Sequence, residues 1–99
     1  MRTLKHLHDS TLKRVDLDWV VGSLAASFIV GADQHEVRIV GDGVKSFSYD
    51  RQFPWGRSAS VNECQIESDR AEAVLTIEMQ SGDILIGKAN SFSVDDTAR

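Results

Sequence analysis

Apolar and polar side chains alternate along much of this chain, and that alternation constrains its fold more than any other feature. Between Val15 and Val21 the odd-numbered residues are apolar, while Asp16 and Asp18 stand between them. The same alternation returns over Leu75–Met79. Because successive side chains of a strand point to opposite faces of a sheet, a period of two is typical of a half-buried β-strand. The sequence therefore predicts a mainly β protein.

The residues that follow the first alternating segment predict a hairpin and its register. Gly22-Ser23 places glycine first in a two-residue connection, as a type II′ turn prefers. This turn brings Trp19 opposite Ala26 and Leu17 opposite Phe28, so the inner face is apolar at each pair. We therefore expect the Trp19 ring to lie over the core.

The next connection extends this hairpin into a three-stranded sheet. Residues 31–34, Gly-Ala-Asp-Gln, form a four-residue loop between two apolar segments. Such a loop pairs Phe28 with Val37 and Ala26 with Ile39, which keeps one face apolar. Residues 15–41 are thus predicted to form an antiparallel meander.

A second hairpin is predicted near the C-terminus. Ser81-Gly82 reads as a two-residue turn that places Met79 opposite Ile84. After it, Phe92 and Val94 form a short terminal strand or pack across the sheet edge.

The middle of the chain departs from strict alternation. A type I′ turn at Asp42-Gly43 would push Phe47 outward, so either a bulge intervenes or one helical turn lies near Val44–Ser48. A second change of phase near residue 60 requires a β-bulge near Asn62-Glu63.

Together these segments predict one mainly β domain over residues 1–99. Six or seven antiparallel strands form a curled sheet or a small sandwich, with or without one short helix near Val44–Ser48. The alternative is an α+β fold in which residues 3–14 are helical. A chain of 99 residues is long enough for a single core.

Charge and cysteine usage narrow the class of protein. The net charge of −4 argues against binding to nucleic acid or to a membrane surface. Residues 1–14 are basic and the rest of the chain is acidic. Cys64 is the only cysteine, which suits a reducing compartment, and no secretory leader or apolar span is recognisable. We expect a cytoplasmic protein without a cofactor.

One candidate site is the segment His6, His8 and Asp9. On an extended strand His6 and His8 would project to the same side and could chelate Zn²⁺ with Asp9. The alternative, which we favour, is a terminal segment whose leucines Leu4, Leu7 and Leu12 dock on the core. In that reading the side chain of Asp9 or Ser10 caps a turn.

A second candidate site is the turn around the only proline of the chain. Polar, basic and aromatic side chains gather there, where the alternation fails. Arginines beside an aromatic ring could bind an anion or a partner's carboxylate, and serines at alternate positions would present hydroxyls on one strand face. The predicted binding residues are Arg51, Trp55, Arg57, Ser58, Ser60 and Asn62. The alternative is a structural turn with Trp55 packed.

Three strings of the sequence carry a family resemblance. They are His8–Leu12 leading into Val15–Trp19, then Pro54–Asn62, then Ile77–Asp83. In this order they resemble a small family of uncharacterised bacterial β-rich domains of about this length. The opening also resembles that of immunity proteins in bacterial toxin systems. This family has no assigned activity, so the resemblance implies no catalytic residue.

Three functions follow as hypotheses. The sequence holds no nucleophile elbow, phosphate loop, H-E-x-x-H or dinucleotide fingerprint, which favours a non-catalytic protein-interaction domain, immunity-like in its narrower form. The first alternative is a domain that binds a small molecule or an anion at the Trp55 turn. The second is a metal-dependent hydrolase built on the histidines. A protein partner and a homodimer stay open.

Overall fold

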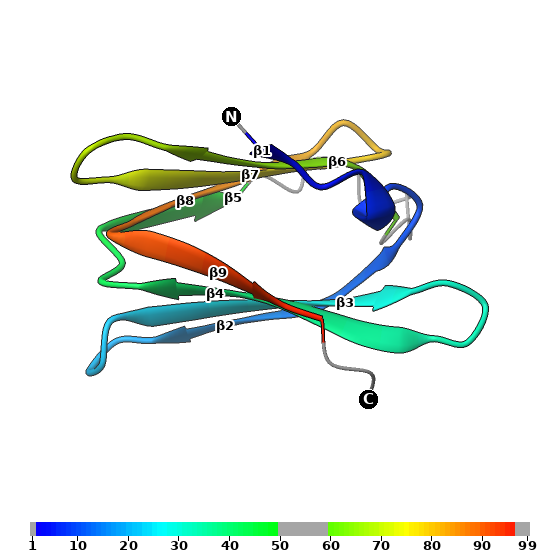
Figure 1. Ribbon diagram of the computed structural model, residues 1–99, viewed down its shortest axis with the longest axis horizontal. Helices are drawn as coiled ribbons and strands as arrows, with labels where there is room; N and C mark the ends of the chain where they lie inside the picture. The colour runs from blue at the N-terminus through cyan, green and yellow to red at the C-terminus, as the bar shows by residue number, and fades with distance from the viewer. Residues whose placement is uncertain (1, 50–59, 97–99) are drawn as a thin grey trace.

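The computed structural model describes residues 2–49 and 60–96, which form two antiparallel sheets packed face to face (Figure 1). One sheet has the strand order β1-β6-β7-β8-β5 and the other β2-β3-β4-β9. The prediction of a mainly β protein is confirmed, in its sandwich form. In chain order the elements are β1 (Arg2–Thr3), the 3₁₀ turn η1 (Lys5–Leu7), β2 (Thr11–Asp18), β3 (Ser23–Val30), β4 (His35–Asp42), β5 (Ser46–Tyr49), β6 (Val61–Ser68), β7 (Ala73–Met79), β8 (Ile84–Ala89) and β9 (Ser91–Asp95).

Besides the crossing through η1, the chain passes between the sheets twice at one corner, where Gly43 and Asn90 meet. Gly43 has a φ of +69°, and a Cβ there would collide with the side chain of Asn90. The N–H of Asn90 donates to the carbonyls of Asp42 (2.9 Å) and Gly43 (3.2 Å). After this corner β5 pairs with β8 and not with β4. The helical turn predicted near Val44–Ser48 is therefore wrong, because the segment changes sheets and stays extended.

The core lies between the sheets and is closed at one end by η1 (Figure 1). Leu7 on η1 is fully buried, as are Phe28 and Ile39 on the lower sheet. The α+β alternative is wrong, because residues 11–18 are a strand and only Lys5–Leu7 turn. The buried cluster contains Leu4, Leu7, Ala26, Phe28, Val37, Ile39, Val61, Cys64, Ile66, Leu75, Ile77 and Met79.

The β2–β3 hairpin differs in register from its prediction. Leu17 lies opposite Leu24, and Val15 opposite Ala26. The Asp18 carboxylate accepts the N–H of Val21 (3.1 Å), and the Asp18 carbonyl accepts that of Gly22 (2.8 Å). Gly22 itself has a φ of +77°. These bonds close a four-residue loop over residues 19–22 in place of the predicted two-residue turn, so Trp19 lies in the loop.

Three further predictions of strand pairing are confirmed. The β3–β4 loop is as predicted, with Phe28 opposite Val37. The predicted bulge is also present, where the β6–β7 register shifts between Val61 and Glu63. The strand predicted at Phe92 and Val94 is β9, which pairs with β4.

The β7–β8 register is displaced by one residue from its prediction. Ile77 lies opposite Leu85 where Ile86 was expected, so Ile84 is exposed. Residues 80–82 form a three-residue loop that ends on Gly82 at a φ of +99°. A glycine in this conformation is typical of the last position of such a loop.

Candidate functional site

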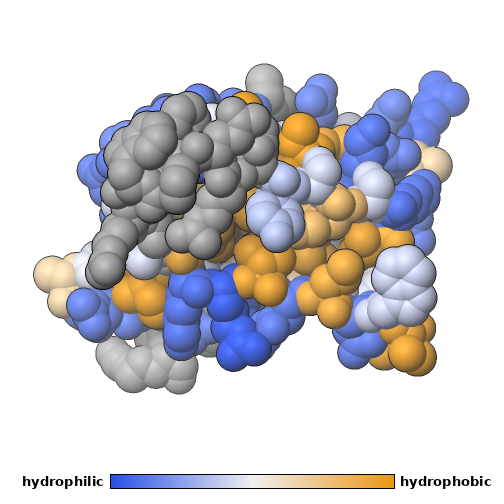
Figure 2. All heavy atoms as spheres, turned by 180° about the vertical axis from the view of Figure 1, so that it is seen from behind, coloured by the Kyte–Doolittle hydropathy of each residue, from blue (hydrophilic) through white to orange (hydrophobic). Residues whose placement is uncertain are grey.

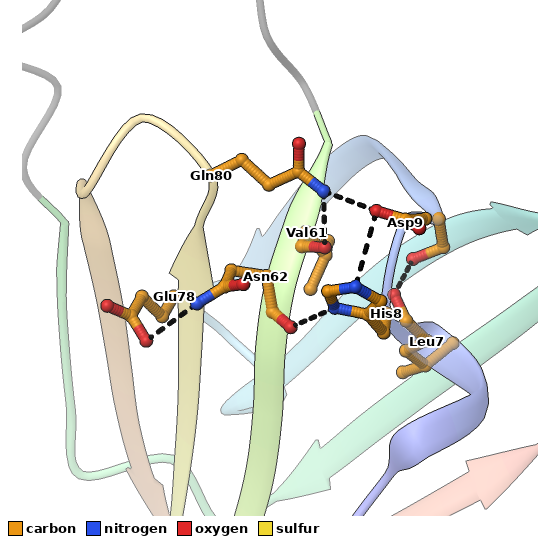
Figure 3. A network of polar contacts seen from close by, with 8 residues as sticks. Leu7, His8, Asp9, Val61, Asn62, Glu78 and Gln80 are labelled. Carbon is orange, nitrogen blue, oxygen red and sulfur yellow. Dashed lines mark hydrogen bonds and ion pairs between the residues drawn. The ribbon is translucent and has the colours of Figure 1, made fainter.

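A polar network joins the N-terminal segment to the bulge of β6 (Figure 3). Nδ1 of His8 donates to the carbonyl of Asn62 (2.7 Å), because a carbonyl oxygen can only accept. The N–H of Asp9 donates to the carbonyl of Val61 (2.8 Å). The Gln80 amide reaches from the β7–β8 loop to the Asp9 carboxylate. The predicted candidates His8, Asp9 and Asn62 thus lie together, and their hydrogen bonds go to backbone carbonyls and to the side chains of Gln80 and Glu78.

The same network fixes the end of η1. The hydroxyl of Ser10 donates to the carbonyl of Leu7 (2.6 Å), and the carbonyl of Ser10 accepts the N–H of Val61 (2.9 Å). Leu4 and Leu7 are buried beneath this turn. This is the docked terminal segment that we favoured from the sequence, with Ser10 as the capping residue.

The structure does not have the geometry that the predicted metal site requires. The prediction assumed an extended strand, but Lys5–Leu7 form a 3₁₀ turn, so His6 and His8 do not alternate along a strand. His6, His8 and Asp9 line a pocket of about 360 Å³, in which Nε2 of His8 is 3.5 Å from the Asp9 carboxylate. Within residues 2–49 and 60–96, no three His, Cys, Asp or Glu side chains are arranged to hold a metal ion.

The second predicted site lies mostly outside the described residues. Arg51, Trp55, Arg57 and Ser58 belong to the part of the chain that the structure leaves undescribed. Of the remaining two, the carbonyl of Ser60 accepts the N–H of Gln80 (2.9 Å). The Asn62 amide donates to Glu78 (3.3 Å). An anion or small-molecule site at this turn therefore stays a prediction.

The thiol of Cys64, the single cysteine of the chain, is buried in the core. Cys64 on β6 is fully covered, and desolvation raises the pKa of its thiol to about 12. Its thiolate population at neutral pH is therefore roughly 1,000-fold below that of an exposed cysteine. Cys64 is thus a small hydrophobic residue of the core, and it offers no nucleophile to solvent.

The surface feature that stands out is an exposed apolar loop. Trp19 is 88% exposed, Val20 92% and Val21 69%, and Leu17 at the end of β2 is 48% exposed. We call these four residues the apolar tip. Figure 2, seen from behind, shows hydrophobic side chains at the surface in a band that runs toward this end of the molecule. Contiguous exposed apolar surface of this kind marks interaction sites.

A pocket of about 250 Å³ adjoins the apolar tip and joins the two sheets. Leu17 and Trp19 line it from the β2 side, and Val44 and Phe47 from the β5 side. Lys45 also lines it. The pocket can therefore accept an apolar side chain and set a charged group beside it.

The sequence analysis missed this surface because Trp19 continues an alternating strand and was assigned to the core. The available signal was Asp18 followed four residues later by Gly22. An aspartate that accepts a backbone N–H, with a glycine able to take a positive φ, is typical of a loop. In the structure the Asp18 side chain and backbone carbonyl both accept hydrogen bonds that close this loop.

Comparison with known proteins defines the fold alone. The chain is similar to a solved structure described as "Crystal structure of an uncharacterized protein from Neisseria gonorrhoeae", with a TM-score of 0.70. The two share 14% sequence identity over 91% of this chain and 93% of the other. Neither a protein-family model nor a curated protein matches the sequence. Within the described residues, no helix has the length and apolar character needed to cross a bilayer.

Proposed function

We propose that this chain is a non-catalytic protein-interaction domain and that the apolar tip is its contact surface. The observation that carries the proposal is the 88% exposure of Trp19 in a loop that is held in place. Burying apolar surface is worth roughly 25 cal/mol per Å², and a large ring left in water forgoes that gain until a partner covers it. Tryptophan is also the residue type most enriched at the energetic centres of protein interfaces.

The hydrogen bonds of the loop support this proposal. The Asp18 side chain accepts the N–H of Val21 in the chain without a partner. A contact surface that is already ordered loses little conformational entropy on association. The pocket between Trp19 and Phe47 provides a recess beside the projecting ring, which is the combination expected of an anchor site.

The narrower form of the proposal is an immunity-like role in the cytoplasm, in which the tip covers and blocks a toxin. The resemblance of the His8–Leu12 opening to immunity proteins supports this role. The net charge of −4 favours a basic partner, and the single cysteine suits a reducing compartment. A toxin gene beside the gene for this chain would support this form, whereas unrelated neighbours would count against it.

The proposal is tested by capture of partners on immobilised protein from the native host. We expect Trp19→Ser to lower the amount of specifically captured protein at least tenfold, because a central interface tryptophan contributes roughly 2 kcal/mol or more. The matched control is Ile84→Ser, which alters an exposed apolar residue on β8 away from the tip. Equal capture by wild type and Trp19→Ser would contradict the proposal.

A further inference from the structure

β2 is an edge strand that carries the apolar tip at one end. It lies at the end of the strand order β2-β3-β4-β9. Thr11 at its start forms an isolated bridge with Ser60, and beyond Thr11 the outer backbone groups of β2 pair with no described strand. It is eight residues long and contains no proline. An edge of this length is a template for pairing with another chain.

We infer that β2 of one copy pairs antiparallel with β2 of a second copy of this chain, with Val15 at the two-fold axis. This inference goes beyond the proposed function, because it concerns the edge of β2 and not the partner of the apolar tip. The interface has a single register, which follows from the two-fold symmetry of the strand pair and from its charges.

Symmetry limits the registers that are allowed. A two-fold axis between antiparallel strands keeps each side chain on its own face of the sheet, so one residue must lie opposite its own copy. In the middle of β2 the candidates for this position are Arg14, Val15 and Asp16. Centring on Arg14 opposes two guanidinium groups, and centring on Asp16 opposes two carboxylates, both of which are destabilising.

Of these three registers, only the Val15-centred one opposes unlike charges without also opposing like charges at the axis. It places Arg14 opposite Asp16 of the second copy, and the symmetry repeats the pair. Both side chains are exposed, and within one chain Nη2 of Arg14 lies 2.8 Å from the Asp16 carboxylate. The two groups therefore already extend over the same face of the sheet, where each can reach its counterpart across the axis.

The same register covers apolar surface that one copy leaves exposed. Val15 is half-buried and packs on the core edge, so the two Val15 side chains meet on the inner face. Leu17 lies beyond the regular pairs, because its position in this register faces the bulge that holds Lys13 of the second copy. In this register the apolar tip lies beyond the N-terminal end of β2 of the second copy. The bulge between Leu12 and Arg14 bounds the regular pairing to the centre of the strand.

The pattern of charges distinguishes this edge from one that is protected against pairing. A protected edge repels a second copy when its charges have one sign, and lysine is the usual choice. In β2 these protective features, Lys13 and the bulge, lie at one end of the strand, and beyond them Arg14 and Asp16 share a face at positions that are complementary about Val15. This edge therefore selects one register rather than excluding all of them.

The test is sedimentation velocity on the full chain over concentrations up to about 100 μM, which spans the affinity of a modest interface. We expect wild type to dimerise, and Arg14→Asp and Asp16→Arg each to weaken dimerisation about tenfold or more through like-charge contacts. The double variant R14D/D16R restores the complementary pairs and should recover wild-type association. Glu67→Arg, which changes an exposed strand residue of the other sheet, should have no effect.

Each outcome has a defined meaning. Wild type that stays monomeric, or a double variant no better than the single ones, would overturn β2 pairing. Circular dichroism of each variant shows whether a loss reflects unfolding. A monomeric wild type whose capture of another protein still depends on Trp19 would leave the proposed function standing. A dimer whose partner capture ignores Trp19 would leave β2 pairing standing and remove the proposed function.

Discussion

Replacing Phe28 by alanine is expected to lower the free energy of unfolding by about 3–5 kcal/mol. Phe28 is 0% exposed and lies at the centre of its sheet, opposite Leu12 on β2 and Val37 on β4. Removing its ring leaves a cavity between strands that cannot close, so the loss includes both transfer and packing terms. Chemical denaturation followed by circular dichroism measures the change.

The control for this prediction is Trp19→Ala. Because Trp19 is 88% exposed, we expect it to change the free energy of unfolding by less than about 0.5 kcal/mol. The sequence-based register, which placed Trp19 opposite Ala26 in the core, would instead require a loss comparable to that of Phe28. A large loss for Trp19→Ala would therefore contradict the observed loop.

Replacing Leu7 by alanine is expected to cost about 2–5 kcal/mol, although the residue lies within the first ten of the chain. Leu7 is 0% exposed, and its carbonyl accepts the Ser10 hydroxyl at the end of η1. The N-terminal segment thus contributes to the core and is not an appendage. Thermal or chemical unfolding of the variant measures the loss.

The matched variant for this second prediction is His6→Ala, which changes the neighbouring exposed residue on the same turn. Its stability should stay within about 0.5 kcal/mol of wild type. Equal stability of the His6 and Leu7 variants would show that the N-terminal segment does not pack on the core as described.

The parts of the fold that alternation determines were predictable from the sequence. In the β3–β4 loop the length of four residues and the apolar pattern agree, which fixes Phe28 opposite Val37. The bulge at Asn62 was predictable because a change of phase inside a strand requires an extra residue. In both places one local signal and the global pattern lead to the same structure.

The hairpin registers failed where a loop is set by hydrogen bonds that alternation does not contain. Moving the β2–β3 turn by an even number of residues keeps every side chain on its face, so the pattern could not reveal the error. The hydrogen bond from the N–H of Val21 to the Asp18 carboxylate sets the length of the loop. At β7–β8 the three-residue loop ending on Gly82 shifts the register by one and turns Ile84 outward.

At the candidate site, the polar residues that the sequence indicated have structural roles, and the exposed surface is apolar. The polar residues that the sequence singled out, His8, Asp9 and Asn62, satisfy the backbone of a docked segment and a bulge. The exposed surface is made of apolar residues that the pattern assigned to the interior. Alternation alone could not separate these cases, because burial depends on the loop at residues 19–22, which Asp18 and Gly22 indicate.

The most direct test of the account is a disulfide across the proposed axis in a Val15→Cys variant. Residues directly opposite in an antiparallel pair have Cβ atoms about 4.5–5.5 Å apart, close enough for a disulfide after a small shift. In a Leu17→Cys variant the two sulfur-bearing residues would be separated by about 13 Å along the strands. The native Cys64 is buried and does not compete.

Mild oxidation followed by non-reducing electrophoresis reads out the result. We expect Val15→Cys to form a covalent dimer in high yield and Leu17→Cys to remain largely monomeric, because only Val15 lies opposite its own copy. Cross-linking of Leu17→Cys as fast as Val15→Cys, or no cross-link in either variant, would contradict pairing of the chain with itself through β2.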